Sequence, residues 1–318
     1  MSVEKRNVVI IGAGPAGYAA GLYAGRAQLD PLLLTGREIG GQLSLTLDVE
    51  NYPGYPGADA AGLIETMQKQ AENFGTEVRI DYVTAVDFGS HPFRLEAESG
   101  AEIEAKSVVI ATGSSPRQLG VPGEEMVGRG VSYCATCDGF FFREKRVVVV
   151  GGGDAALEEG MFLTRFASEV HVVHRRDQLR ANVTLQDRAF KNEKMRFIWD
   201  SVVEEILGGD EGVYAVRLKN VKTGETSEFE TDGVFIFIGH EPNTQLYEGQ
   251  IELDDKGYIV TDKLQQTSVK GVFAGGDVQD YIYRQAVTAA GTGAGAAIEA
   301  ERFLAELENR AYPGLTRD

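Results

Sequence analysis

A glycine-rich motif occurs twice in this chain, and both copies have the same kind of neighbours in the sequence. The first copy, Gly12-x-Gly14-x-x-Gly17, follows the apolar stretch Asn7–Ile11 and opens a small-residue segment over 14–27. The second copy, Gly151-x-Gly153-x-x-Ala156, follows Arg146–Val150 and opens a helical segment that ends at about Phe166. A strand, a glycine turn and a helix N-terminus form a dinucleotide-binding fingerprint, because backbone N–H groups there can approach a pyrophosphate. Two copies predict an α/β fold with two Rossmann-like dinucleotide-binding units, one for a nicotinamide donor and one for a flavin acceptor.

The order of the other segments predicts that the first unit is discontinuous. The apolar strand Ser107–Ala111 ends in a polar connector at 114–116, and the chain crosses between units again near 239–243. We therefore predict one domain of residues 1–115 and 244–318, and a second domain of residues 116–243. Within them we expect strands at Pro31–Leu34, Val78–Val86, Phe93–Ala97, Glu169–His174, Gly233–Ile238 and Gly271–Gly275, and helices at Ala60–Phe74 and Arg284–Leu307.

The residues after each second strand predict which dinucleotide each unit binds. His174, Arg175 and Arg176 end the second strand of the second unit, with Arg180 close behind. Arginines at this position accommodate the 2′-phosphate of NADPH, although an exposed, solvated charge run is the alternative. The first unit has Thr35, Gly36 and Glu38 at the equivalent place, where an acidic side chain can bind an adenosine ribose. FAD is assigned there mainly because NADPH takes the other unit.

The only two cysteines are Cys134 and Cys137, and Asp138 follows directly. In a CxxC pair one thiolate can attack a disulfide, the second can resolve the mixed disulfide, and a neighbouring acid can return the proton. A buried, inert cysteine pair is the alternative. Two cysteines exclude a secreted multi-disulfide framework, and no metal is expected, because the four histidines show no paired motif that would complete a zinc site.

The formal net charge of −17 argues against a nucleic-acid partner and against anionic membranes. Lys5 and Arg6 precede apolar residues as in a signal peptide, but the glycines of the first motif interrupt that run. No apolar stretch reaches the roughly 18 residues of a membrane span. A cytoplasmic protein is expected.

Several longer segments resemble the low-molecular-weight thioredoxin reductases, and they extend from the N-terminus to about Arg302. They are Gly40–Leu43, Val49–Gly54, Ala111–Gly113, Gly128–Phe141, His174–Asp177, Gly276–Val278 and Tyr283–Ala286. The resemblance implies a thioredoxin-disulfide reductase that passes electrons from NADPH through FAD and the cysteine pair to thioredoxin. It also implies the fold of the pyridine nucleotide-disulfide oxidoreductases and a homodimer.

The resemblance carries residue roles as well. Cys137 would lie against the flavin, Cys134 would attack the partner disulfide, and Asp138 would act as acid and base. The implied FAD contacts are Gly12, Gly14, Pro15, Ala16, Gly17, Thr35, Gly36, Glu38, Gly41, Gln42, Asn51, Val83, Ala111, Thr112, Gly113, Gly276, Asp277, Arg284, Gln285 and Ala286. The implied NADPH contacts are Gly151, Gly153, Asp154, Ala155, His174, Arg175, Arg176 and Arg180.

Two departures from the family pattern concern the second loop, where relatives often have a hydroxyl residue near Ala155 and an alanine at Gly160.

The resemblance also implies a surface for the partner protein, which would contact Arg129, Phe140 and Phe141. Because the cysteines belong to the NADPH unit and the flavin to the other, we also expect the units to rotate during turnover.

Other functions remain open from the sequence. The same flavin and cysteines could reduce a peroxiredoxin or another thioredoxin-like partner, although the larger flavoproteins of that kind carry an extra N-terminal redox domain. A ferredoxin-type NADP reductase of similar architecture is another candidate, but such an enzyme needs no CxxC pair. A dinucleotide-sensing module without turnover is disfavoured by the CxxC-Asp sequence.

Overall fold

The structure is a computed structural model that describes residues 3–45, 49, 51–57 and 59–310. It divides into two compact units. The first consists of Met1–Ser44, Tyr52–Ser115 and Glu241–Asp318, and the second of Leu45–Asn51 and Pro116–His240.

The first unit is built on a mostly parallel sheet of seven strands. The strand order is β3-β2-β1-β6-β5-β4, and β17 also pairs with β6. The strands are β1 (Glu4–Ile11), β2 (Pro31–Leu34), β3 (Glu77–Arg79), β4 (Val83–Asp87), β5 (Phe93–Ala97), β6 (Glu102–Ile110) and β17 (Val272–Ala274). Strands β1, β2, β3, β6 and β17 run parallel, whereas β5 is antiparallel to both β4 and β6.

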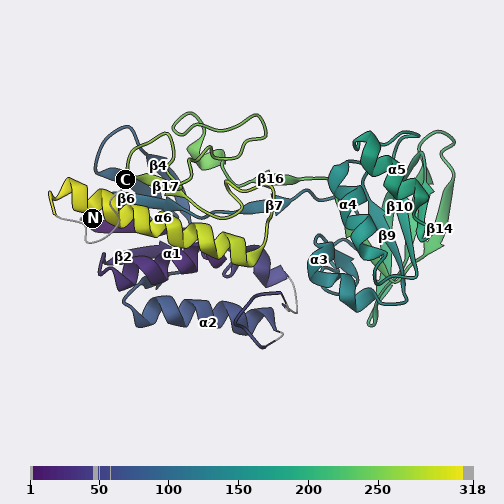
Figure 1. Cartoon of the computed structure of the whole chain (residues 1–318), viewed down its shortest axis with the longest axis horizontal. Coiled ribbons are helices and arrows are strands. Elements are labelled where there is room, and N and C mark those ends of the chain that lie inside the picture. The colour runs from purple at the N-terminus through teal and green to yellow at the C-terminus, as the bar shows by residue number, and fades with distance from the viewer. Residues whose placement is uncertain (1–2, 46–48, 50, 58, 311–318) are drawn as a thin grey trace. The chain divides into compact units, whose positions relative to one another are not determined.

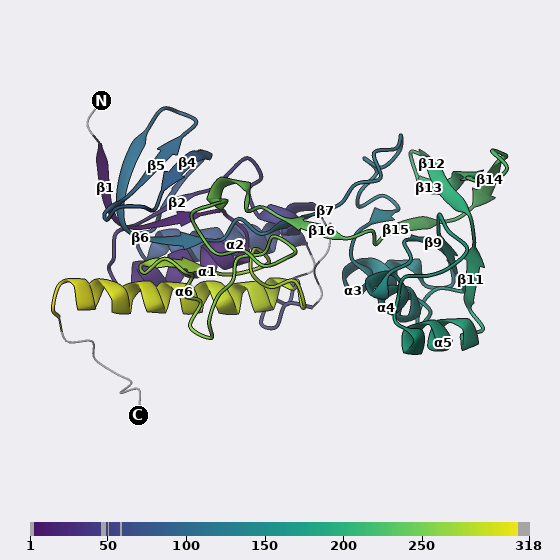
Figure 2. The ribbon, with the colours of Figure 1, turned by 90° about the horizontal axis from the view of Figure 1, so that it is seen from above.

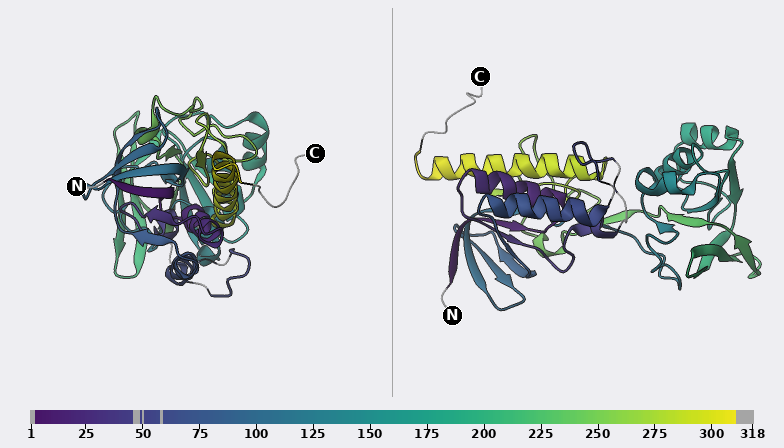
Figure 3. Two further views of the ribbon diagram at one scale, coloured as in Figure 1. Left: turned by 90° about the vertical axis from the view of Figure 1, so that its left-hand side faces the viewer. Right: turned by 90° about the horizontal axis from the view of Figure 1, so that it is seen from below.

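Three helices of the first unit form one layer on the sheet (Figure 1 and the right panel of Figure 3). They are α1 (Pro15–Arg26), α2 (Ala60–Asn73) and α6 (Ala286–Leu307); short 3₁₀ turns occur at Gly41–Leu45 and Gln245–Tyr247. Helix α1 buries mostly Gly and Ala, which allows its neighbour α6 to come very close. A Cβ atom added at Gly293 of α6 would lie 2.0 Å from the carbonyl oxygen of Ala16, so only glycine fits there.

The second unit has a parallel sheet of five strands in the order β11-β10-β9-β15-β8. These strands are β8 (Val131–Ser132), β9 (Arg146–Val150), β10 (Glu169–Val173), β11 (Met195–Ile198) and β15 (Gly233–Ile236). The helical elements are α3 (Ala135–Asp138), a 3₁₀ turn (Gly139–Phe142), α4 (Asp154–Leu163) and α5 (Val183–Lys191). A separate antiparallel sheet contains β12 (Ser201–Gly209), β13 (Gly212–Asn220) and β14 (Thr226–Glu230), visible in Figure 2.

The all-valine run of β9 is explained by two apolar cores, one on each face of the five-stranded sheet. Val147 and Val149 belong to the cluster that contains the helix residues Leu157 and Leu185. Val148 and Val150 belong to the cluster formed with β12 and β13. A strand that is buried on both faces reads as a continuous apolar run rather than as an alternating one.

The predicted strand Val78–Val86 is wrong, because this stretch forms two strands at opposite edges of the first sheet. Strand β3 pairs with β2, whereas β4 pairs with β5. Asp81 interrupts the run: its carboxylate accepts hydrogen bonds from the backbone N–H of Tyr82 (2.9 Å) and of Ser99 (3.2 Å). A side chain that satisfies nearby backbone donors in this way favours a turn over a continuous strand.

The last helix begins two residues later than predicted. Arg284 has a left-handed φ of +48°, and Gln285 is the extended N-cap residue of α6, so the first helical residue is Ala286. The sequence prediction lacks several elements of the second unit: β8, β11, the short helix α3, helix α5 and the three-stranded β12–β14 sheet.

The two crossings between the units pair with each other as β7 (Ser114–Pro116) and β16 (His240–Pro242). Asn243, which follows β16, is hydrogen-bonded to the two residues that precede β7. Its backbone N–H donates to the Gly113 carbonyl at 3.0 Å, and its side-chain amide donates to the Thr112 carbonyl at 2.8 Å. None of the described helices is long and apolar enough to cross a membrane.

Candidate redox site and dinucleotide-binding loops

The first glycine loop connects β1 to α1 and leaves open space beside the N-terminus of that helix. A Cβ at Gly17 would lie 1.8 Å from the Gly12 carbonyl oxygen, so glycine is required for the loop to close on the helix. At Gly14 a Cβ would meet nothing closer than the Gly40 carbonyl oxygen at 4.0 Å. Gly14 is the N-cap residue of α1, and no side chain of a described residue caps the helix. Uncapped N–H groups beside an open cradle are suited to a pyrophosphate.

The other predicted FAD contacts of the first unit mostly follow the carboxyl ends of its parallel strands. Thr35 and Gly36 follow β2, residues 111–113 follow β6, and Gly276 and Asp277 come shortly after β17. Parallel strands present their carboxyl ends at one edge of the sheet, which is where α/β folds bind ligands. Gly41 and Gln42 begin a 3₁₀ turn, and Glu38 is exposed. Val83 lies instead in the apolar core, and Asn51 is exposed in the loop before α2.

Asp277 is the most perturbed carboxyl group in the first unit. Burial raises its pKa to about 7; the neighbouring Asp280 also raises it, and Arg284 opposes both effects. Among the described residues, no hydrogen bond to this carboxyl group is present. A largely buried carboxyl group that accepts no hydrogen bond from the described residues fits a ligand that supplies hydroxyl groups.

The second glycine loop connects β9 to α4 and repeats this geometry. Gly151 has a φ of +153°, and a Cβ there would lie 2.5 Å from the Phe237 carbonyl oxygen. At Gly153, the N-cap residue of α4, a Cβ would meet no protein atom within 4 Å. The loop is fixed from outside because the N–H of Arg180 donates to the Gly152 carbonyl at 2.7 Å.

Asp154 and His174, both predicted NADPH contacts, also have structural partners. The Asp154 carboxylate accepts from the backbone and side-chain N–H groups of Asn182, at 2.7 and 3.1 Å, which ties the start of α4 to the start of α5. The His174 ring packs on Gly152, where a Cβ would lie 2.3 Å from the ring. Its Nε2 lies 3.1 Å from the Gln178 carbonyl oxygen, so this nitrogen carries the hydrogen.

Three arginines stand exposed just after β10. No described carboxylate forms an ion pair with Arg175, Arg176 or Arg180. His174 is buried beside them, and its pKa is lowered first by that burial and then by the three positive charges. This cluster therefore presents positive charge to solvent at a strand end, which suits a phosphate monoester.

The cysteines form a disulfide at the start of the short helix α3. Cys134 Sγ accepts a hydrogen bond from the N–H of Cys137 at 3.2 Å and lies 3.4 Å from the Thr136 hydroxyl oxygen. Hydrogen bonds to a sulfur favour its thiolate form, and among the described contacts the backbone N–H of Cys137 points to the sulfur of Cys134.

Asp138, which follows Cys137 in the sequence, is held by a residue that sequence reasoning missed. The Ser132 hydroxyl donates to Asp138 Oδ2 at 2.6 Å. On the other side of the segment, the Tyr133 hydroxyl donates to the buried Glu124 at 2.7 Å. A serine and a tyrosine beside a CxxC pair give no signal in the sequence, because these contacts depend on the folded loop.

Phe140 and Phe141 follow α3, and both are largely exposed, at 47% and 41% of their surface. They contact each other edge to face, with ring centroids 6.2 Å apart. Exposed aromatic rings next to a redox-active disulfide suit contact with a protein partner.

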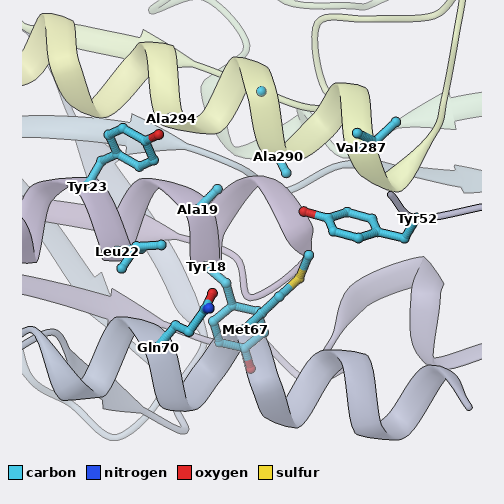
Figure 4. A pocket seen from close by; sticks show the side chains of 11 residues that line it. Tyr18, Ala19, Leu22, Tyr23, Tyr52, Met67, Gln70, Val287, Ala290 and Ala294 are labelled. Atoms are coloured by element: carbon cyan, nitrogen blue, oxygen red, sulfur yellow. The ribbon is translucent and has the colours of Figure 1, made fainter. Parts of the chain in front are cut away.

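A pocket of about 260 Å³ lies among α1, α2 and α6 (Figure 4). Tyr18, Tyr23 and Tyr52 line it together with small residues of α6. None of the predicted catalytic or cofactor-binding residues lines this pocket, so it is separate from the dinucleotide loops.

A disulfide beside an acid, in a chain with two dinucleotide loops, defines a dinucleotide-dependent disulfide oxidoreductase. The family model described as pyridine nucleotide-disulphide oxidoreductase matches residues 6–293. A thioredoxin reductase of Rickettsia conorii is 53% identical over 94% of this chain and 98% of that protein. The chain belongs to this family and, within it, to the thioredoxin reductases.

Solved structures agree with this membership. The thioredoxin reductase from Streptococcus pyogenes has a TM-score of 0.90 at 46% identity, covering 96% of this chain and 100% of that one. The Lactococcus lactis thioredoxin reductase, described as an FR conformation, has a TM-score of 0.66 at 45% identity, covering 95% and 99%. The predicted α/β fold class and family resemblance are thereby confirmed, and membership implies the use of a flavin and a pyridine nucleotide.

Proposed function

We propose that the chain catalyses the NADPH-dependent reduction of thioredoxin, with FAD bound to the first unit and NADPH to the second. The observation that carries this proposal is the Cys134–Cys137 disulfide beside Asp138, in the unit that also holds the arginine cluster. FAD and NADPH together would supply the electron pair that reduces this disulfide. All later bond changes involve sulfur atoms of the two proteins.

Reduction of the disulfide leaves Cys134 as the attacking thiolate. It attacks one sulfur of the thioredoxin disulfide, which forms a mixed disulfide and releases the other thioredoxin sulfur as a thiolate. Asp138 takes up the proton of the Cys134 thiol and passes it to that sulfur. Cys137 then attacks Cys134, and its own thiol proton passes through Asp138 to the second thioredoxin sulfur. This step restores the Cys134–Cys137 disulfide and releases reduced thioredoxin.

The open cradle at Gly14 and the unpartnered carboxyl group of Asp277 support FAD in the first unit. Gly14 would bring backbone N–H groups to the pyrophosphate. Asp277 would accept hydrogen bonds from ribityl hydroxyl groups, as the family resemblance implies. The N-terminus of α6 near Arg284 would face the flavin ring and stabilise negative charge there.

The open space at Gly153 and the exposed arginines support NADPH in the second unit. The pyrophosphate would lie at the N-terminus of α4, and Arg175, Arg176 and Arg180 would bind the 2′-phosphate. Since the carboxylate of Asp154 is engaged by Asn182, its role in this site is to hold the loop.

With FAD in the first unit, and NADPH and the cysteine pair in the second, the units must change their arrangement during turnover. Both the nicotinamide and Cys137 must approach the flavin to roughly 3–3.5 Å, and both belong to the second unit. The two solved relatives support such a change: their identities and coverages are nearly equal, yet their TM-scores are 0.90 and 0.66. The paired crossings β7 and β16 would act as the hinge.

We further propose a homodimer, as the family resemblance implies, and a cytoplasmic location, where thiols are kept reduced by systems of this kind. A peroxiredoxin or another thioredoxin-like protein is the alternative partner. Phe140 and Phe141 would contact the partner in either case.

The experiment that tests the function is NADPH-dependent insulin reduction by the purified protein with candidate thioredoxins from the same source. We expect a yellow protein whose flavin absorbance bleaches with NADPH, and insulin reduction only when thioredoxin is present. Bleaching without transfer to any thioredoxin, but with transfer to a peroxiredoxin, would favour the alternative partner. A protein that does not bleach with NADPH would contradict the proposal.

A further inference from the structure

Ser132 is a buried hydroxyl whose hydrogen bonds all go to the redox segment. The side chain is on β8, directly before Tyr133 and Cys134, and the residue is only 2% exposed. Its Oγ accepts from the Cys134 N–H at 3.1 Å and lies 2.6 Å from Asp138 Oδ2 and 3.2 Å from the Cys134 carbonyl oxygen.

A serine hydroxyl has one hydrogen to donate, so these two acceptors compete for it. The contact to Oδ2 is shorter, and an ionised carboxylate is the stronger acceptor, so Asp138 receives the hydrogen while it is ionised. When Asp138 is protonated its oxygen becomes a weaker acceptor, and the Cys134 carbonyl can take a larger share. The hydroxyl can therefore respond to the charge on Asp138 without leaving its position.

We propose that Ser132 is a positioning residue that holds the Asp138 carboxyl group at the cysteine pair and favours its ionised form. The inference rests on the proposed acid and base role of Asp138. A donor to the ionised form lowers the pH at which a carboxylate takes up a proton. Ser132 thereby keeps Asp138 at the end of the CxxC segment in the form that accepts the proton of the Cys134 thiol and can then pass it to a departing thiolate.

Other charged groups near α3 must be kept unchanged in any test of this pH dependence. Cys134, the N-cap residue of α3, and Cys137 within α3 become ionisable thiols once the disulfide is reduced. Asp154, Glu158 and Glu159 lie on α4, which packs against α3. Arg143 follows the 3₁₀ turn that packs on α3, and Glu124 lies behind Tyr133.

The test compares five variants of the holoenzyme: Ser132→Ala, Ser132→Thr, Asp138→Asn, the Ser132→Ala/Asp138→Asn double variant, and Ser201→Ala as a matched control. Ser201 is also a buried serine of the second unit, but its hydroxyl donates to the Trp199 carbonyl, at 2.8 Å, and not to an acid. The measurement is kcat with thioredoxin across the pH range, with flavin bleaching by NADPH as the check that each variant is folded.

We expect Ser132→Ala to lower kcat at neutral pH by about tenfold. In the plot of kcat against pH, the acidic limb, where Asp138 takes up a proton, should move to higher pH by about one pH unit. Ser201→Ala should keep the wild-type profile. In the Asp138→Asn background, Ser132→Ala should have almost no further effect, because the group through which it acts is gone. Ser132→Thr, which keeps the hydroxyl, should restore the wild-type profile.

An equal effect of Ser132→Ala with and without Asp138 would overturn the inference, as would an unmoved pH profile. Either result would make Ser132 a purely structural residue of the loop while leaving the role of Asp138 intact. If Asp138→Asn itself keeps the wild-type rate and profile, the proposed role of Asp138 fails instead, and the inference about Ser132 fails with it.

Discussion

Asp277 should have opposite effects on the stability of the FAD-free protein and on its affinity for FAD. Its pKa is raised by burial to about 7, from 3.8 for an unperturbed aspartate. The folded FAD-free protein therefore holds this proton more tightly than the unfolded chain. Its stabilising contribution is fully present below pH 3.8 and is lost as the pH rises through about 7, a difference of ~4 kcal/mol at most.

Asp277→Asn should therefore raise the unfolding free energy of the FAD-free protein at pH 8 and should also weaken FAD binding. In the wild type, FAD affinity should increase as the pH rises towards 7, because ribityl hydroxyls donate to the ionised carboxylate, and the variant should lack this dependence. Thermal melts of the FAD-free protein and flavin-fluorescence titrations would measure both. A variant that binds FAD as tightly as the wild type at pH 8 would show that Asp277 does not face the flavin.

The sequence predicts local backbone geometry where a motif fixes it, but it does not show side-chain contacts that depend on a partner elsewhere in the chain. Gly12, Gly17 and Gly151 have the close backbone contacts that the fingerprint requires. The engagement of Asp154 by Asn182 could not be read from the chain, because it depends on how α4 and α5 meet. The contact of Ser132 with Asp138 was missed for the same kind of reason.

At the level of helices and loops, the glycines of the first loop predict a matched pair of variants. Gly17→Ala places a Cβ 1.8 Å from a backbone oxygen, so the loop must shift, and the first unit should lose about 1–3 kcal/mol or more of stability. Gly14→Ala points its methyl group into open space and should fold normally, but it should weaken FAD binding because that space is the pyrophosphate cradle. Thermal melts without FAD and FAD titrations separate the two effects. Wild-type FAD affinity in Gly14→Ala would show that the cradle does not hold the cofactor.

The strand end of β10 gives a second prediction at this level. Replacing Arg175, Arg176 and Arg180 together with glutamine should raise the KM for NADPH by about tenfold or more per arginine, since each charge-assisted contact contributes roughly 1.5–3 kcal/mol. The KM for NADH should change little. Arg188→Gln, at the exposed end of α5, is the control and should leave both values unchanged. Equal increases for NADPH and NADH would contradict a 2′-phosphate site.

The secondary structure was predictable where apolar runs are buried on both faces and less so where charges stabilise a strand. Strand β1 begins at Glu4 rather than Asn7, because Glu4–Arg6 pair with Ile103–Ala105 of β6. Glu4 and Arg6 also form ion pairs with Arg79 and Glu77 of β3. These charged residues resemble a solvated terminus in the sequence. The β12–β14 sheet was overlooked because its residues mix charges with apolar positions that face the second core only in the folded unit.

For the whole molecule, the two glycine motifs and the order of the apolar strands around them predict two units and a chain that returns to the first. The sequence predicts loops for the two connectors between the units, whereas the structure pairs them as strands β7 and β16. Their residues are Ser, Pro, His and Glu, which have no strand signature, so the pairing comes from the two crossings lying next to each other. Such a connection can bend while each unit keeps its own core.

The most direct test of the proposed electron path is an anaerobic experiment with Cys134→Ser, in which flavin absorbance and thioredoxin reduction are followed in the same sample. The account predicts that NADPH still bleaches the flavin of this variant at the wild-type rate, because Cys134 acts only after the flavin. Thioredoxin should remain oxidised, because the attacking thiolate is missing. Reduction of thioredoxin at the wild-type rate by Cys134→Ser would contradict the account.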